Sequence, residues 1–275
     1  MELTLLGTGC PSVDHKRFGP SNLVSTKAAS ILVDCGSGIT QRLHELKVSS
    51  ADIDALLFTH LHSDHAVDLY QLIISSWHSY RIKPWKIYGP KGTKKFVKKI
   101  MDAWADERKL RIAYESRASA KAFDMQVTEF KSIGAIKIKD LNIKYFEVDH
   151  KPVKFAYGFS FTNKNKKLTI SGDTKPCENL MKYAQRSDVL LHEVFIEGEI
   201  LQINKMRTKK TLHNVQSYHT TSTQVGKVAF IANAKKLVLT HFVPTSFNKN
   251  KLKKVVKKDF GKDPIIGEDL MKIKI

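Results

Sequence analysis

Short apolar strands alternate with helices near both ends of this 275-residue sequence, and a block of strands separates the two regions. The first region predicts strands at 2–6, 30–35, 55–59 and 86–89 and helices at 39–46, 66–80 and 91–104. Residues 124–171 are rich in alternating β-branched and aromatic residues, which is typical of antiparallel strands. The last region predicts helices at 178–184, 222–234 and 249–260, with strands at 188–194 and 236–242. This order favours an α/β fold with two mixed β-sheets face to face and helices outside.

No linker or low-complexity stretch divides the pattern, so we expect residues 1–275 to form a single domain. No apolar stretch reaches the roughly 18 residues that a membrane span needs. The start, MELTLLGTGCP, lacks the basic and apolar segments of a signal peptide. The three cysteines are an odd number at unrelated spacings, which argues against a disulfide framework. These features predict a cytoplasmic protein without a membrane partner.

The sequence is strongly basic, with a formal net charge of +19 at pH 7. Lysine and arginine neutralise phosphates, so this charge is compatible with a nucleic-acid partner. A solvated surface that is rich in lysine gives the same net charge without a nucleic-acid partner. Charge alone does not choose between the two interpretations.

The segment THLHSDH (59–65) directly follows the apolar run ALLF and concentrates side chains that bind metals. A rigid strand end can present His60, His62, Asp64 and His65 at one edge of a sheet. Imidazole nitrogens and carboxylate oxygens are ligands that zinc prefers. These four are too closely spaced for all to reach one ion, so His60 and His62 could serve one metal, and Asp64 and His65 a second.

Other predicted strands also end in residues with metal-ligand chemistry. Asp149 and His150 follow the strand NIKYFEV, Asp173 follows KLTISG, and His241 follows KLVLT. A two-metal centre needs ligands beyond the 59–65 loop, and Asp173 stands where a carboxylate could bridge two ions. Further histidines occur at 192, 213 and 219, the last just before a predicted helix.

Taken in order, GTG, VDCG, THLHSDH, VDH, SGDT, LLHE, HTT and LTHF resemble the motifs of the metallo-β-lactamase superfamily. Within it, the chain is similar to the ribonuclease Z and arylsulfatase-like branch. The motifs extend over residues 5–243, so the resemblance covers nearly the whole chain. It implies a four-layer αββα sandwich and a metal-dependent hydrolase.

The resemblance also implies a role for each matching residue. It assigns His60, His62 and His150 to a first metal ion, Asp64, His65 and His241 to a second, and Asp173 to a bridge between them. Asp34 matches a buried carboxylate that steadies the 59–65 loop. His219 matches a histidine near the scissile phosphate, and Glu193 a glutamate that orients it. Asp64, Glu193 and His219 are therefore the candidate catalytic residues.

Two metal ions about 3.5–4 Å apart can share one hydroxide and lower its pKa toward about 7. That hydroxide would attack a phosphorus, sulfur or carbonyl carbon, while the second metal and His219 stabilise the developing charge. Cysteine is absent from every proposed ligand position, so we expect two Zn²⁺ ions, with Mn²⁺ or Fe as alternatives.

The sequence departs from long-form ribonuclease Z between His150 and Asp173. That relative carries an extended insertion there that clamps transfer RNA, whereas this chain has only residues 151–172, read as two strands and a lysine-rich turn. Residues 195–218, with Lys205, Arg207, Lys209 and Lys210, form either a lid over an anionic substrate or a solvated loop. Trp77, Tyr80 and Trp85 line either the pocket or the core.

The leading hypothesis is hydrolysis of a phosphodiester, either a small diester or a nucleic-acid end. The first alternative is an arylsulfatase, lactonase or thioesterase that uses the same site. The last is a non-catalytic nucleic-acid-binding module. The oligomeric state is left open, with a homodimer as the candidate assembly.

Overall fold

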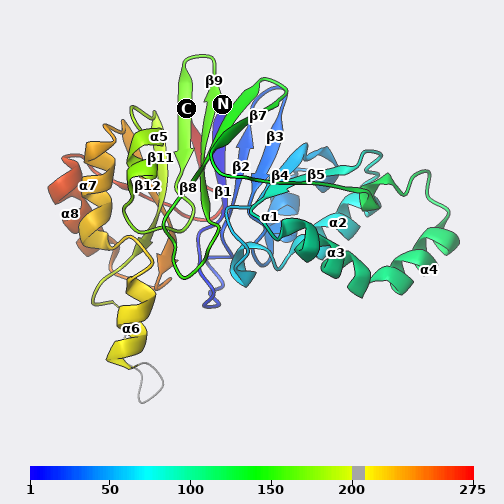
Figure 1. Cartoon of the computed structure of the whole chain (residues 1–275), viewed down its shortest axis with the longest axis horizontal. Helices are drawn as coiled ribbons and strands as arrows, with labels where there is room; N and C mark the ends of the chain where they lie inside the picture. The colour runs from blue at the N-terminus through cyan, green and yellow to red at the C-terminus, as the bar shows by residue number, and fades with distance from the viewer. Residues whose placement is uncertain (200–207) are drawn as a thin grey trace.

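The computed structural model describes residues 1–199 and 208–275 and contains two seven-stranded sheets that lie face to face (Figure 1). The first sheet has the order β14-β1-β2-β3-β4-β5-β6 and the second β13-β12-β11-β10-β9-β8-β7. The strands of the first sheet are β1 (Glu2–Gly7), β2 (Ser21–Ser25), β3 (Ser30–Val33), β4 (Ala55–Leu57), β5 (Trp85–Gly89), β6 (Met125–Glu129) and β14 (Lys272–Lys274). Those of the second are β7 (Gly134–Ile138), β8 (Leu141–Glu147), β9 (Tyr157–Asn163), β10 (Lys166–Ile170), β11 (Val189–Phe195), β12 (Lys236–Val243) and β13 (Ile265–Ile266).

Helices cover the outer face of each sheet. On the first sheet, α1 (Ile39–Glu45), α2 (Leu69–His78) and α3 (Thr93–Ala103) pack in one apolar cluster with the strands. On the second sheet, α5 (Glu178–Tyr183), α7 (Ser222–Ile231) and α8 (Lys249–Phe260) do the same. The predicted four-layer αββα sandwich is confirmed. In the described part of the chain, no helix is long and apolar enough to cross a membrane.

The inner faces of the two sheets share one apolar core. Leu3, Leu5 and Val33 of the first sheet belong to the same buried cluster as Phe159 and Val238 of the second. Side chains alternate across each strand, so one set fills this inner core while the other set contacts the helices. The site described below lies at one edge of this double sheet.

Of the two positions left open for Trp77, Tyr80 and Trp85, the core is correct for the two tryptophans. Trp85 belongs to the apolar cluster of the first sheet, Trp77 of α2 is 2% exposed, and Tyr80 is 80% exposed. None of the three lines the pocket beside the metal-ligand candidates. The indole N–H groups of both tryptophans find acceptors within the protein, which is what burial of this side chain requires.

The sequence pattern missed several elements. β2 lies within the segment predicted as a loop, and it is a strand because it pairs with both β1 and β3. Strands β13 and β14 near the end of the chain pair with β12 and β1. Helices α4 (Ala105–Glu115) and α6 (Lys209–Gln216) bury no residue fully, so they lack the wide apolar stripe that marks a core helix.

Asp54 joins the two sheets at a turn just before β4. Its carboxylate accepts hydrogen bonds from Lys83 Nζ, the Ser30 amide and Lys139 Nζ, and Lys139 follows β7 of the second sheet. Burial alone would raise the pKa of Asp54, but the bonds from Lys139, Ser30 and Lys83 outweigh it and hold the pKa below its usual value. The ionised carboxylate therefore stabilises the folded state.

We expect Asp54→Asn to lower the free energy of unfolding by about 1 kcal/mol at neutral pH. Because the pKa is lowered on folding, the difference from the native protein is full above the unfolded-state pKa of about 3.9. It then shrinks as the pH falls through the folded-state pKa. Urea titrations of both proteins between pH 7 and pH 3 check this, and a difference that grows on acidification would refute it.

Candidate metal centre

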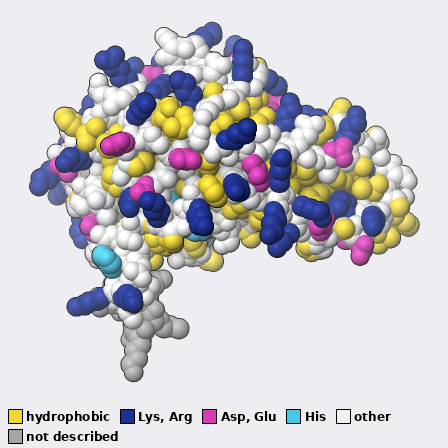
Figure 2. All heavy atoms as spheres, in the orientation of Figure 1, with side chains coloured by type: hydrophobic (Ala, Val, Ile, Leu, Met, Phe, Trp, Pro, Cys, Tyr) yellow, Lys and Arg dark blue, Asp and Glu magenta, His cyan; other side chains and the backbone are white. Residues whose placement is uncertain are grey.

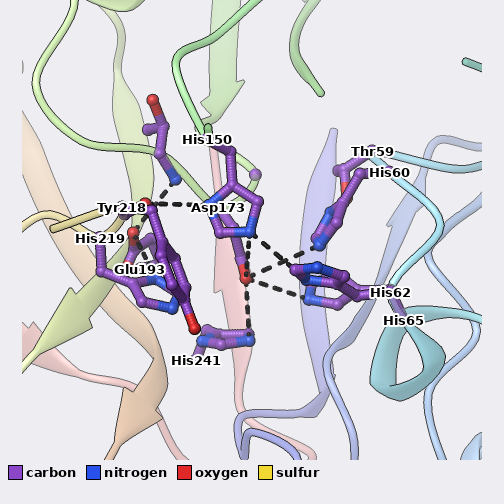
Figure 3. A network of polar contacts seen from close by, with 12 residues as sticks. Thr59, His60, His62, His65, His150, Asp173, Glu193, Tyr218, His219 and His241 are labelled. Atoms are coloured by element: carbon purple, nitrogen blue, oxygen red, sulfur yellow. Dashed lines mark hydrogen bonds and ion pairs between the residues drawn. The ribbon is translucent and has the colours of Figure 1, made fainter. Parts of the chain in front are cut away.

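All seven ligand candidates come together at one edge of the double sheet, and Figure 3 labels six of them, all except Asp64. The loop after β4 carries His60 and His62, and the short 3-10 helix η2 (Ser63–His65) carries Asp64 and His65. The other three follow or end strands of the second sheet: His150 after β8, Asp173 after β10 and His241 in β12. The convergence that the sequence could only imply is present in the fold.

The first group is His60, His62 and His150, whose nearest ligand atoms all lie within 4.8 Å of one another. His150 Nε2 is 3.4 Å from His62 Nδ1. His60 and His150 are buried, whereas His62 is exposed at the pocket mouth. Burial holds the pKa of His60 well below its ordinary value and lowers that of His150, so both rings favour the neutral form that binds metals.

The second group is Asp64, His65 and His241, again with ligand atoms within 4.8 Å of one another. Asp64 Oδ2 is 3.3 Å from His241 Nε2 and 3.6 Å from His65 Nε2. This group combines one carboxylate with two imidazoles. The first group has imidazoles alone.

Asp173 lies between the two groups. Its Oδ2 is 3.2 Å from His241 Nε2 and 3.3 Å from His65 Nε2, and on the other side 3.9 Å from His60 Nε2 and 4.0 Å from His150 Nε2. Burial would raise the pKa of this carboxyl, but His241 and then His65 hold it well below its usual value. One anionic oxygen therefore faces four imidazoles drawn from both groups.

Unpaired polar atoms indicate that these residues fit a metal. The Nε2 atoms of His60 and His65 are buried and make no hydrogen bond with any residue that the structure describes. A buried polar atom without a partner costs about 1–3 kcal/mol, and such atoms are rare in native proteins. Both atoms face Asp173, so a cation bound there would satisfy them.

Hydrogen bonds on the far side of three rings orient these nitrogens. His65 Nδ1 is 2.9 Å from Asp34 Oδ2, and His150 Nδ1 is 2.9 Å from the carbonyl oxygen of Tyr218. Thr59 Oγ1 donates to Asp34 and so accepts from His60 Nδ1 at 3.0 Å. These partners favour a proton on each Nδ1, so Nε2 is the nitrogen that a cation would bind. Burial lowers the pKa of His65, but Asp173, Asp64 and Asp34 raise it well above its ordinary value, so a cation bound there would displace a proton from this ring.

Asp34 supports the 59–65 loop as the resemblance implies. It is buried and adopts a left-handed conformation with φ of 63°, and its carboxylate also accepts from the Thr59 amide at 2.8 Å. Burial raises the pKa of this carboxyl although His65 and Thr59 act in the opposite direction. The left-handed conformation is strained for a residue other than glycine, and the hydrogen bonds with Thr59 and His65 hold Asp34 in it.

We expect Asp34→Asn to weaken metal binding by about 10- to 100-fold, because an amide cannot accept all three of these bonds. Competition with a chromogenic zinc chelator measures the affinity, and the far-ultraviolet dichroism spectrum shows whether the fold persists. Asp259→Asn, at an exposed carboxylate of α8, serves as control. An affinity within twofold of the native value would contradict the supporting role.

A β-bulge directs His241 into the centre. In the pairing of β11 with β12, Glu193 is opposite Thr240 but Val194 is opposite Phe242, so His241 is an extra residue. It has a φ of 45°, which turns the strand at this point. Gly172, with a φ of 62°, makes a comparable turn before Asp173, where an added Cβ would lie 2.6 Å from the Tyr157 carbonyl oxygen.

His219 and Glu193 form a buried pair next to the two groups. His219 Nδ1 is 3.0 Å from Glu193 Oε1, which also accepts from the amides of Thr174 and Thr220. Burial lowers the pKa of His219, but Glu193 outweighs it and raises the pKa to about 9. The ring centroid of His219 lies 5.2 Å from that of His150 and 5.6 Å from that of His241.

Two further histidines, His192 and His213, lie outside the candidate metal centre. His192 is buried beneath Glu193 and its Nδ1 is 2.8 Å from the Glu193 carbonyl oxygen, while His213 is exposed on α6.

The centre opens into a pocket of about 370 Å³. Besides four ligand candidates (His62, Asp64, Asp173 and His241) and His219, the pocket is lined by Cys10, Pro11, Ser12, Ser63, Thr211, Leu212, Val215, Tyr218, Val243 and Pro244. Sequence reasoning missed these residues, although it did place the 195–218 segment near the site. Within that segment α6 reaches the pocket, whereas Lys205 and Arg207 of the predicted lid lie outside the described residues.

Comparison with known proteins agrees with this geometry. Residues 1–203 match the family described as anti-Pycsar protein Apyc1. Ribonuclease Z of Mycobacterium bovis is 34% identical over 89% of this chain and 86% of its own length. The chain belongs to the Apyc1 and ribonuclease Z families, within the metallo-β-lactamase superfamily. It is thus a metal-dependent hydrolase of the ribonuclease Z type.

Solved structures share the fold of the present chain over nearly its whole length. The metallo-β-lactamase fold protein YhfI from Bacillus subtilis has a TM-score of 0.78 at 19% identity, covering 99% of this chain and 98% of its own. The short form of human tRNase Z has a TM-score of 0.73 at 22% identity, covering 100% and 99%. The Apyc1 match ends at residue 203, before His219 and His241, whereas the YhfI match covers 99% of the chain.

Proposed function

We propose that this hydrolase is a dinuclear-zinc phosphodiesterase that acts on a small phosphodiester or on a nucleic-acid end. The observation that carries the proposal is the position of Asp173 Oδ2 between two groups of three ligand candidates. A bridging carboxylate serves a pair of ions, and neither group alone requires it. Zinc suits the imidazole-rich ligand set, with Mn²⁺ or Fe as alternatives.

The ligand residues would hold two ions, which supply Lewis acidity toward a phosphoryl oxygen and lower the pKa of water. Asp64 and Asp173 offset the positive charge of the ions. Glu193 fixes the ring of His219 through Nδ1, which leaves Nε2 free to donate to a substrate in the pocket. His219 would therefore stabilise charge on a phosphoryl oxygen or on the leaving group.

Two observations bear on the size of the substrate. Strands β9 and β10 are joined directly by a short turn, so the segment between His150 and Asp173 forms a plain hairpin without an extended arm. Lys and Arg side chains are spread over the face seen in Figure 2 and are interleaved with Asp and Glu. Both observations favour a small diester or a chain end over a large folded RNA. The homodimer stays a prediction.

The test is a comparison of three substrates on the zinc- and manganese-loaded protein: bis-p-nitrophenyl phosphate, p-nitrophenyl sulfate and an acyl lactone. We expect the highest kcat/KM for the phosphate diester. Faster cleavage of the sulfate or the lactone would favour the arylsulfatase or lactonase alternative. Two bound metal equivalents without hydrolysis of any ester would favour the non-catalytic module.

A further inference from the structure

Helix α6 carries two apolar side chains that the core does not use. Leu212 and Val215 are three residues apart on one face of the helix, and both are half-buried. Neither belongs to the three apolar clusters that hold the described part of the fold together. Both line the pocket beside the candidate metal centre. Leu212 and Val215 are therefore half-buried because they line the pocket, and they do not pack in the apolar core.

These side chains belong to an apolar part of the pocket lining. Pro11 in the loop after β1, Val243 at the end of β12 and Pro244 directly after it also line the pocket. Tyr218 continues the apolar row of α6, and its ring packs edge-on against His150 at a centroid distance of 5.1 Å. The same pocket is also lined by the polar side chains of Asp64, Asp173 and His241.

We propose that Leu212 and Val215 form an apolar subsite that selects phosphate esters carrying an aromatic or other large apolar group. The proposal rests on the proposed phosphodiesterase function and narrows its substrate class. An ester whose phosphoryl group lies at the metal centre would place its substituent against α6. Half-buried apolar side chains on an otherwise polar helix gain contact area from such a substituent.

The expected size of the preference for a phenyl group follows from the apolar contact that this group makes with the pocket. Small differences in apolar contact change discrimination by about 10- to 200-fold. We expect the native protein to bind a phenyl-substituted ligand about tenfold or more tightly than its methyl counterpart. Both ligands offer the same phosphonate group to the metal centre, so the difference reports the apolar lining of the pocket, and substitutions on α6 separate the share of Leu212 and Val215.

Calorimetric titration of the zinc-loaded full chain with phenylphosphonate and methylphosphonate tests the subsite without a chemical step. The double variant Leu212→Ala/Val215→Ala should lose most of the preference for the phenyl ligand, and Leu212→Met/Val215→Ile should keep it. Asn214→Ala, on the exposed side of the same helix, should bind both ligands like the native protein. All variants should melt like the native protein because α6 buries no residue fully.

Equal affinity of the native protein for both ligands, or an unchanged preference in the double alanine variant, would overturn the subsite. Hydrolysis of bis-p-nitrophenyl phosphate, measured in parallel, separates the two proposals. If the native protein fails to cleave the diester but prefers phenylphosphonate through α6, the phosphodiesterase assignment fails and the subsite stands. If it cleaves the diester without that preference, only the subsite fails.

Discussion

Replacing Asp173 with asparagine is expected to lower kcat/KM for a phosphodiester by about 1,000-fold or more. The substitution keeps the shape of the side chain but removes the charge that faces His65 and His241 at 3.3 and 3.2 Å. Metal ions supply several kcal/mol of transition-state stabilisation, and each 1.36 kcal/mol is a factor of ten in rate. Loss of the bridge should therefore remove both a bound ion and most of the rate.

Steady-state kinetics and metal analysis of the same preparation check this result. We expect the metal content to fall from two equivalents to one or fewer. Asp259→Asn, at an exposed aspartate of α8, provides a matched control that should retain both ions and full activity. A variant at position 173 that keeps two ions and a rate within tenfold of the native value would show that this carboxylate does not bridge.

Replacing His219 with alanine is expected to lower kcat by about 100- to 10,000-fold, the range typical of a positioned proton donor. Unlike the change at Asp173, this one should leave two metal ions bound. His219 is also close enough to His150 and Asp173 to be a ligand, so metal content decides between the two roles. His213→Ala, at an exposed histidine on α6, is the control and should be fully active.

The contribution of Glu193 can be separated with a double-mutant cycle. If Glu193 acts by orienting His219, Glu193→Gln should slow the native protein about 100-fold but add little to the loss in His219→Ala. Independent, multiplicative losses would mean that the glutamate acts on another group. Loss of a metal ion in His219→Ala would instead place this histidine among the ligands.

Much of the candidate site could be predicted because its ligands follow apolar strands that the sequence marks clearly. The 59–65 loop and Asp173 each follow a run of buried β residues, and their strands, β4 and β10, lie in the two facing sheets and end at the same edge of the sandwich. The fold class followed from the same alternation of strands and helices. These features depend on short-range pattern, which a sequence displays directly.

Other features depend on contacts between distant residues. The bulge at His241 and the left-handed conformation of Asp34 arise from pairing and hydrogen bonds that no local pattern encodes. β14 is a strand because it pairs with β1 at the opposite end of the chain. Leu212 and Val215 look like a weak helix stripe in the sequence, and only the position of α6 relates them to the pocket.

The most direct test of the account is the anomalous scattering of zinc in a crystal of the native protein. The account predicts two peaks about 3.5–4 Å apart. One should lie about 2.0–2.2 Å from ligand atoms of His60, His62 and His150, and the other at the same distance from those of Asp64, His65 and His241. Asp173 should contact both. A single peak, or peaks remote from Asp173, would contradict it.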